Sequence, residues 1–202
     1  MSKIAPNQSL PAAYFDEVYS ESPDPWGFAT REYEQNKYQD TLAHLPRAQY
    51  TRTLEIGCSI GVLTAQLSSR TEELLAIDIS ELPLQSARAR CAELSGVSFQ
   101  RMAFPHEVPS TSFDLIMVSE VAYYWGGTDL SLAQQQLLQL LRPGGDLMLV
   151  HWLPFVTDYP YTGDEVHDSF TTFAAAHALD HIGSKREPLY RMDIFRRSGV
   201  VT

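Results

Sequence analysis

The sequence predicts an α/β fold with a mainly parallel sheet that helices cover on both faces. Short apolar runs alternate with amphipathic runs between Thr53 and Trp152, and strands that alternate with helices form parallel sheets through right-handed crossovers. The run FDLIMVSE (113–120) is apolar almost throughout, as in a strand that is covered on both faces. A chain of 202 residues fits one domain, so we expect residues 1–202 to form a single domain.

The N-terminal region differs from the rest in composition. Residues 1–30 are rich in Pro, Ser and aromatic residues, which predicts an extended arm with turns. A helix is predicted over residues 31–45, because Tyr38, Leu42 and Leu45 lie on one face of it. We expect residues 1–50 to act as an arm and a helix that close over a bound ligand.

The alternating region contains five predicted strands with helices between them. The strands are TLEI (53–56), LLAIDI (74–79), VSFQRM (97–102), FDLIMVSE (113–120) and DLMLVHW (146–152). The helices are VLTAQLSSR (62–70), SELPLQSARARCAEL (80–94), with Ser80 as its cap, and DLSLAQQQLLQLLRPGG (129–145), with a Pro-Gly-Gly stop. In the second helix, the buried stripe is predicted to hold Leu84, Ala87, Cys91 and Leu94. A last helix (164–179) precedes HIGSKRE (181–187) and YRMDIFRR (190–197), which are predicted to pair as a hairpin-like edge.

Composition and charge exclude several classes of protein. The formal net charge is -10 and the sequence has no basic stripe, so nucleic acid is not expected as a partner. MSKIAPNQSL lacks the apolar stretch of a secretory signal and no run of 18 apolar residues occurs, so we expect a cytoplasmic protein without membrane contact. Cys58 and Cys91 have no CxxC spacing, which fits neither a metal site nor a disulfide scaffold. Cys58 is either a nucleophile or a small residue that fills a tight turn.

The stretch TLEIGCSIGVLTAQL (53–67) places an acid and two glycines between a strand and a helix. Ligands of open α/β sheets bind at the carboxyl ends of the strands, beside such a turn. A dinucleotide site needs G-x-G-x-x-G, but Ser59 occupies the position of the second glycine, which weakens a phosphate-binding interpretation. The pattern G-x-x-x-x-G-K-[ST] does not occur, so a P-loop is excluded. The short motif alone is also compatible with a plain βα turn.

A nucleoside without phosphates fits this turn better. Asp78 ends the second predicted strand, 21 residues after Gly57, where a carboxylate can accept hydrogen bonds from both ribose hydroxyls. Glu55 lies at the mouth of the turn and can bind an ammonium group or offset a positive sulfonium. A ligand with a ribose, an amino-acid tail and a cationic sulfur is S-adenosylmethionine, which becomes S-adenosylhomocysteine once its methyl group is transferred.

Four segments resemble the class I S-adenosylmethionine-dependent methyltransferases: LEIGCSIG, LLAIDIS, FDLIMVSEVAYYW and LRPGGDLMLVHW. The resemblance covers about Asp24 to Arg196. It implies a Rossmann-like, seven-stranded, mostly parallel sheet whose antiparallel last strand is YRMDIFRR. It also implies cofactor contacts from the glycine turn and from the ends of the following strands, namely Glu55, Ile56, Gly57, Cys58, Gly61, Asp78, Ile79, Met102, Ala103, Ser119 and Glu120. The family usually has an acid after the third strand for the adenine amino group, where VSFQRMAF has Met102 and Ala103. Either backbone groups bind the adenine, or Met102 covers its face.

DPWGFATREYEQNKYQDTL (24–42), the glycine motif and SEVAYYW (119–125) resemble the nodulation protein S (NodS) subgroup of these enzymes. Its known members methylate the free amine of a deacetylated chitooligosaccharide. The resemblance therefore implies N-methylation of an amine on a small molecule or an oligosaccharide. The alternatives are O-methylation of a hydroxyl on a small metabolite, a module that binds the cofactor without transferring methyl groups, and nicotinamide-dependent reduction, which Ser59 disfavours.

Methyl transfer needs an aligned donor and acceptor and a group that removes a proton. Glu120, at the end of the fourth predicted strand, either orients an amine or contacts the cofactor. Tyr123 either contacts a sugar or packs under a loop. His151 is either a proton acceptor or a structural histidine bonded to backbone.

The segment TGDEVHDS (162–169) offers a second histidine. His167 lies three residues after Asp164, so on a helix the acid can orient the imidazole. Alternatively, Asp164 and Glu165 only complement the dipole of the helix. Scattered acids and histidines do not define a metal site.

Three residues of the N-terminal region are candidates for cofactor contacts. Trp26 either covers the cofactor and excludes water or anchors a turn. Tyr33 and Lys37 lie four apart on the first predicted helix, from which they can reach the cofactor carboxylate. The alternative for Lys37 is a solvated surface charge.

Overall fold

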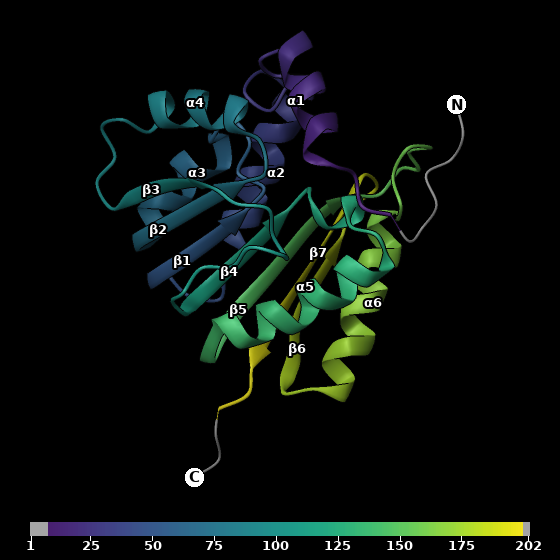
Figure 1. Ribbon diagram of the computed structural model, residues 1–202. Helices are drawn as coiled ribbons and strands as arrows, with labels where there is room; N and C mark the ends of the chain where they lie inside the picture. Colours follow the sequence, from purple (N-terminus) through teal and green to yellow (C-terminus); the bar gives the residue numbers. More distant parts are fainter. Residues whose placement is uncertain (1–7, 200–202) are drawn as a thin grey trace. The chain divides into compact units, whose positions relative to one another are not determined.

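The computed structural model describes residues 8–199 (Figure 1). Within them the chain forms two compact units. The first unit is Pro11–Glu107. The second runs onward from Val108 and includes the short segment that ends at Leu10.

The first unit contains three parallel strands and four α-helices. Its elements are α1 (Ala12–Glu21), α2 (Glu32–Ala43), β1 (Tyr50–Ile56), α3 (Val62–Leu67), a 3₁₀ turn η1 (Ser68–Arg70), β2 (Thr71–Asp78), α4 (Glu81–Arg90) and β3 (Val97–Arg101). Strand β2 lies between β1 and β3 and pairs in parallel with both. Helix α4 packs against β2 and β3, and α1 packs against α4.

Helix α1 corrects the prediction of an extended arm over residues 1–30. Phe15 and Tyr19 are buried and lie four residues apart on this helix, which is the spacing of one helical face. The Pro and Ser content of the region concealed this short amphipathic pattern. The first seven residues of the predicted arm lie outside the described residues.

The second unit contains four strands and two α-helices. Its elements are β4 (Phe113–Ser119), a 3₁₀ turn η2 (Ala122–Tyr124), α5 (Gly127–Leu140), β5 (Leu141–Trp152), α6 (Gly163–Ala176), β6 (Leu179–Arg186) and β7 (Tyr190–Arg197). Strand β5 is parallel to β4 and antiparallel to β7, and β6 pairs with β7 as an antiparallel hairpin. Helix α6 packs against β5, β6 and β7. These pairings confirm the predicted hairpin at the C-terminal edge.

The sheet has seven strands in the order β3-β2-β1-β4-β5-β7-β6. Strand β7 is antiparallel to its neighbours, as the class I methyltransferase resemblance implies. Strand β4 is buried along most of its length, as expected for a strand covered on both faces. In the part of the chain that the structure describes, no helix combines the length and apolarity that crossing a bilayer requires.

The helices end a few residues earlier than the sequence predicts, most clearly α4 and α5. Helix α4 stops at Arg90, so Leu94 lies beyond it and is partly exposed, while Leu84 and Cys91 are buried as predicted. Helix α5 stops at Leu140, because the backbone becomes extended at Leu141, two residues before the proline. A residue that precedes proline avoids the helical conformation, which explains why the helix stops ahead of Pro-Gly-Gly.

Candidate functional site: a glycine turn and a buried histidine network

The turn between β1 and α3 depends on left-handed backbone at three residues. The φ angles are 79° at Gly57, 51° at Ser59 and 77° at Gly61. The amides of Gly57 and Cys58 both donate to the carbonyl of Ile77 on β2, at 2.9 and 3.0 Å. The turn is therefore fixed against the end of the neighbouring strand.

Gly61 is required by close packing as well as by its φ angle. A Cβ at this position would lie 2.9 Å from the Cβ and 3.0 Å from the Cα of Ala87 on α4. Neither atom is the end of a flexible side chain, so the helix itself would have to move.

We expect Gly61→Ala to lower the free energy of unfolding by about 3 kcal/mol, from left-handed strain and overpacking together. Gly144→Ala is the matched control, because Gly144 has the same φ of 77° but no atom within 4 Å of an added Cβ. It should cost only about 1 kcal/mol. Chemical denaturation checks both values, and equal losses would contradict the role of the Ala87 contact.

Asp78 ends β2 beside this turn. Its carboxylate accepts hydrogen bonds from the backbone N–H of Ser59 at 2.9 Å and of Ser80 at 3.0 Å. Burial raises the pKa of Asp78 to about 6, although these amides favour the charged form. Ser80 caps α4 as predicted, since its hydroxyl accepts from the N–H of Leu82. The turn, the carboxylate and the start of α4 thus form one hydrogen-bonded group, and Ile79 lies between Asp78 and the cap.

Glu55 lies on β1 and is buried. Its Oε2 atom has no hydrogen-bond partner among residues 8–199. Burial raises the pKa of Glu55 to about 8, with the Thr64 hydroxyl opposing the shift and Asp78 adding to it. A buried carboxylate oxygen without a partner is costly unless a ligand donor supplies one.

Two neighbours of Glu55 in the motif serve the core. Ile56 is buried at the end of β1. Cys58 packs with Ala76, Leu84 and Phe99, and burial raises the pKa of its thiol well above the usual value. This environment favours the second interpretation of Cys58, a small residue in a tight turn, over a nucleophile.

Aromatic residues of α1 and the following turn lie beside the glycine turn. The hydroxyl of Tyr19 hydrogen-bonds to that of Ser59. Trp26 contacts the Tyr19 ring edge-to-face, with ring centroids 5.5 Å apart, and stacks on Phe28 at 5.6 Å. Sequence reasoning found Trp26 but not Tyr19, because the helix that carries Tyr19 was not predicted.

Lys37 is not a solvated surface charge. Its side chain is buried and its ammonium lies 2.8 Å from the carboxylate of Glu34. The ammonium also lies 5.3 Å from the centroid of the Tyr33 ring. The structure therefore brings Tyr33 and Lys37 together on α2, as their spacing predicted.

Met102 and Ala103 follow β3, where the family usually has an acid. Met102 is buried and donates its N–H to the Asp78 carbonyl at 2.9 Å. The N–H of Ala103 donates to Oε2 of Glu107 at 2.7 Å. A carboxylate is thus present at this point, but it comes from four residues further along the chain, which the local pattern did not reveal.

In the second unit, Glu120 is held in an uncommon conformation at the end of β4. Its φ is 56°, and its Oε2 atom accepts from the Tyr123 hydroxyl at 2.7 Å and from the Trp152 N–H at 2.9 Å. Ser119, which precedes it, is buried. A non-glycine residue held at positive φ is often found at a functional site.

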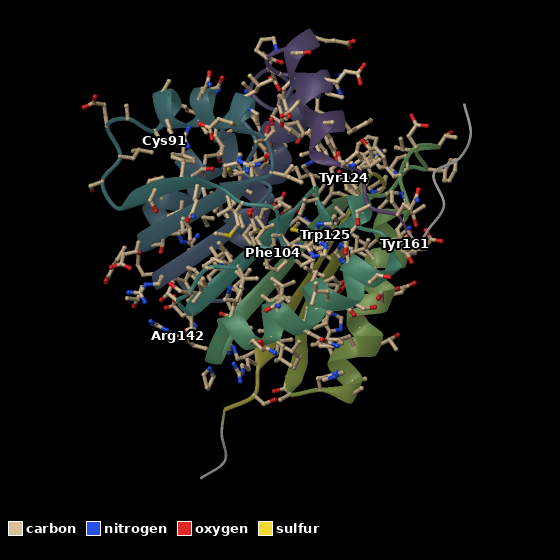
Figure 2. The ribbon with its side chains drawn as sticks, in the orientation of Figure 1. Cys91, Phe104, Tyr124, Trp125, Arg142 and Tyr161 are labelled. Atoms are coloured by element: carbon tan, nitrogen blue, oxygen red, sulfur yellow. The ribbon has the colours of Figure 1, made fainter. Side chains whose placement is uncertain are left out.

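Tyr123 belongs to a group of tyrosines. It stacks on Tyr159 with ring centroids 5.0 Å apart and meets Tyr124 edge-to-face at 4.6 Å. The Tyr124 hydroxyl lies 3.3 Å from the Tyr159 hydroxyl. Tyr124 is labelled in Figure 2. Burial raises the pKa of Tyr123 and Tyr124 well above the usual value. Tyr159 was not identified from sequence, because it lies in an irregular segment.

His151 and His167 are fully buried and bonded to each other. Nε2 of His151 accepts the N–H of Ala122 at 3.1 Å, and its Nδ1 lies 3.0 Å from Nε2 of His167. Nδ1 of His167 lies 2.6 Å from Oδ2 of Asp193 on β7. The bond to backbone was one of the two interpretations of His151.

Asp164 is not the acid that orients His167. Its carboxylate pairs with Arg186 and Arg191 on the hairpin, and Asp193 bonds the imidazole instead. Glu165 forms a capping box with Thr162, as an acid in the first turn of a helix can. Asp193 lies in the predicted strand YRMDIFRR, and an acid between apolar residues of a strand was a signal of a buried partner that was not used in the sequence analysis. Among residues 8–199, no group of three or more potential ligands could hold a metal ion.

Together, the sheet order and the glycine turn define the class, which is that of the class I S-adenosylmethionine-dependent methyltransferases. Within it, the chain belongs to the Nodulation protein S (NodS) family, whose sequence profile matches residues 17–151.

Relatives and solved structures agree with this assignment. Nodulation protein S of Rhizobium tropici is 30% identical over 127 residues, which cover 62% of this chain and 53% of the relative. The chain thus spans about half the length of that protein. N-methyltransferase NodS from Bradyrhizobium japonicum WM9, solved with S-adenosylhomocysteine, has the same fold, with a TM-score of 0.78, 21% identity, and coverage of 92% of this chain and 97% of the other. A candidate methyltransferase from Pseudomonas syringae is 32% identical, with a TM-score of 0.70 and coverage of 83% and 100%.

Proposed function

We propose that this chain is an S-adenosylmethionine-dependent N-methyltransferase that acts on an amine of a small molecule or an oligosaccharide. The observation that carries the proposal is the buried Oε2 atom of Glu55, which has no partner among the described residues and lies on the strand that enters the glycine turn. The ammonium group of an amino-acid tail would supply the missing donor.

The chemistry of the first unit fits the cofactor. The carboxylate of Asp78, fixed by two backbone amides, would accept the ribose hydroxyls through its remaining lone pairs. The buried side chain of Met102 would cover the adenine, and Trp26 would exclude water. In the same proposal, Lys37 and Tyr33 contact the cofactor carboxylate. When bound, S-adenosylmethionine supplies an electrophilic methyl group.

In the second unit, we assign the acceptor amine to Glu120 and Tyr123. An amine is a nucleophile only after it loses its extra proton, and a carboxylate can bind the ammonium form and take up that proton. Nε2 of His151 and Nε2 of His167 both accept hydrogen bonds inside the protein. We therefore assign neither histidine as the base, and Glu120 takes this role in the proposal.

Both the relatives and the site support this acceptor class. The NodS protein of Bradyrhizobium japonicum is described as an N-methyltransferase, and the resemblance to this subgroup points to the free amine of a deacetylated chitooligosaccharide. Tyrosine rings beside a carboxylate suit a ligand that is both cationic and ring-shaped.

A panel of matched acceptors tests the proposal. Each amine, including glucosamine and a deacetylated chitooligosaccharide, is assayed beside its N-acetylated form for release of S-adenosylhomocysteine and for gain of one methyl mass. We expect turnover of amines and none of their acetylated forms. Turnover of both forms would indicate O-methylation, and cofactor binding without any turnover would indicate a binding module.

We expect Glu120→Gln to lower kcat/KM for the acceptor by about 10²- to 10³-fold, because loss of a positioned base typically costs this much. Glutamine keeps the size and one oxygen but cannot take up a proton. Glu187→Gln, at a surface ion pair with Lys185, is the control and should leave kcat/KM unchanged. Steady-state kinetics measures kcat/KM for the acceptor, and cofactor titration checks that the variant still binds the cofactor. Wild-type activity in Glu120→Gln would contradict the assignment of Glu120 as the base.

A further inference from the structure

A directional line of hydrogen bonds runs from the end of β4 to β7. The Ala122 amide donates to Nε2 of His151 at 3.1 Å. Nδ1 of His151 is hydrogen-bonded to Nε2 of His167 at 3.0 Å, and Nδ1 of His167 is hydrogen-bonded to Asp193 at 2.6 Å. All three side chains have an exposed fraction of 0%. We refer to His151, His167 and Asp193 as the relay.

The direction of every bond in the relay follows from its first donor. A backbone N–H can only donate, so Nε2 of His151 accepts and its proton lies on Nδ1. That proton is donated to Nε2 of His167, whose own proton on Nδ1 is donated to Asp193. The relay is complete only when both imidazoles are neutral and the carboxylate is charged.

A proton added to either imidazole would place two donors face to face. On Nε2 of His151 it would oppose the Ala122 amide, and on Nε2 of His167 it would oppose the Nδ1 proton of His151. No solvent-exposed ring nitrogen is present in the two buried imidazoles to accept it instead. Protonation therefore breaks either the hydrogen bond from Ala122 to His151 or the next one, between His151 and His167.

Charged groups from every surrounding element act on the relay. Asp193 also receives hydrogen bonds from Nε2 of His181 on β6 and Nε of Arg191 on β7, both at 2.7 Å. The other titratable groups nearby are Glu120 and Tyr123 after β4, Asp164 and Asp168 on α6, and Arg186 on β6. Burial lowers the pKa of His167 although Asp193 favours its charged form. Burial alone would raise the pKa of Asp193, but His167 and Arg191 hold it below the usual value.

The relay ends on the segment that carries the proposed acceptor site. Two hydrogen bonds to β5 fix Glu120, from its N–H to the Val150 carbonyl and to its carboxylate from the Trp152 N–H. The bond from Ala122 to His151 fixes the next part of the segment, directly before Tyr123. The Tyr123 hydroxyl in turn donates to Glu120.

We propose that the relay is a positioning device of the methyltransferase, which holds Ala122 and so keeps Tyr123 hydrogen-bonded to Glu120, and that a proton gained by either imidazole releases this segment and stops turnover. The pairing of Glu120 with the acceptor rests on the proposed function. His151, His167 and Asp193 act through Ala122 and Tyr123 and do not touch the reacting atoms.

The kinetic test is Asp193→Asn, followed over pH 5 to 9. The amide oxygen can still accept from His167, but the negative charge that favours the imidazolium is lost. At pH 8 both imidazoles are neutral and every bond of the relay can form, so we expect kcat to stay within about threefold of wild type. The acid limb of the profile should move to lower pH, and cofactor affinity should stay within twofold. General damage to the fold would not move the acid limb in this direction.

Asp146→Asn is the matched control. Asp146 is equally buried, lies on the same strand as His151, and pairs with Arg196 of β7 at 2.7 Å. It should leave the acid limb in place and kcat within twofold. An unchanged acid limb in Asp193→Asn, or the same shift in Asp146→Asn, would overturn the proposal.

A spectroscopic test needs neither a variant nor an acceptor. In the wild-type protein, the ¹⁵N–¹H resonance of Ala122 should titrate together with the imidazole protons. An Ala122 amide that is invariant from pH 5 to 9 overturns the relay proposal, even if Asp193→Asn fails to fold. If no acceptor is methylated, the proposed function fails, while this titration still decides whether the relay controls the segment.

Discussion

Asp78→Ala should weaken binding of S-adenosylhomocysteine by about 100-fold or more. The substitution would remove two hydrogen bonds to ribose hydroxyls, and each bond to a charged group contributes about 1.5–3 kcal/mol. It would also leave the amides of Ser59 and Ser80 without the Asp78 carboxylate, to which they donate at 2.9 and 3.0 Å in the wild-type protein. Calorimetric titration of both proteins measures the loss.

A thermodynamic cycle separates the ribose contact from damage to the turn. Wild type and Asp78→Ala are each titrated with S-adenosylhomocysteine and with its 2′-deoxy analogue. Removal of the hydroxyl should weaken binding to wild type and have little effect on the variant, because the partner is already gone. Equal losses in both proteins would show that Asp78 does not bind the diol.

Cofactor affinity should rise with pH up to about 8, and Glu55→Gln should remove most of this dependence. The pKa of Glu55 is raised to about 8 by burial, so the unliganded protein holds a proton there at pH 7. Binding of a ligand ammonium favours the charged carboxylate and expels that proton. Titration of S-adenosylhomocysteine in two buffers of different ionisation enthalpy counts the protons released, and Glu55→Gln should release fewer.

The same shift makes the unliganded protein less stable at high pH. For a carboxyl group with a raised pKa, the contribution to stability is complete below the unfolded value of 4.5 and is lost as pH rises through about 8. The loss is on the order of 5 kcal/mol, at about 1.4 kcal/mol per pKa unit. Denaturation at pH 5, 7 and 9 should show a smaller decline for Glu55→Gln, and parallel declines would contradict the assignment.

Most of the fold was predictable because its strands carry strong local patterns. In β1, β2, β4 and β5, an apolar run of a few residues is enough to predict the strand. The C-terminal hairpin also has residues typical of strands. Helix α1 was missed because its pattern is carried by few residues in a region rich in Pro and Ser. Local periodicity thus predicts elements best where burial is continuous.

The sites were predictable in part. Glu55, Gly57, Gly61 and Asp78 lie in one short motif and the next strand, so their proximity follows from the parallel βαβ order. The relay could not be derived in the same way. His167 and Asp193 come from a helix and a distant strand, and sequence offered the nearer Asp164 as the partner. Such pairings depend on helix rotation and strand register, which spacing along the chain does not define.

The family pattern ends at His151, the residue through which the relay meets the segment after β4. His167, Asp193 and Tyr159, which support that segment, all lie beyond the residues that the profile matches. The relay therefore depends on residues outside the range that the family profile matches, whereas the glycine turn and Asp78 lie within it. Substitutions in the last quarter of the chain can thus change the support of the segment after β4 while the residues of the glycine turn stay the same.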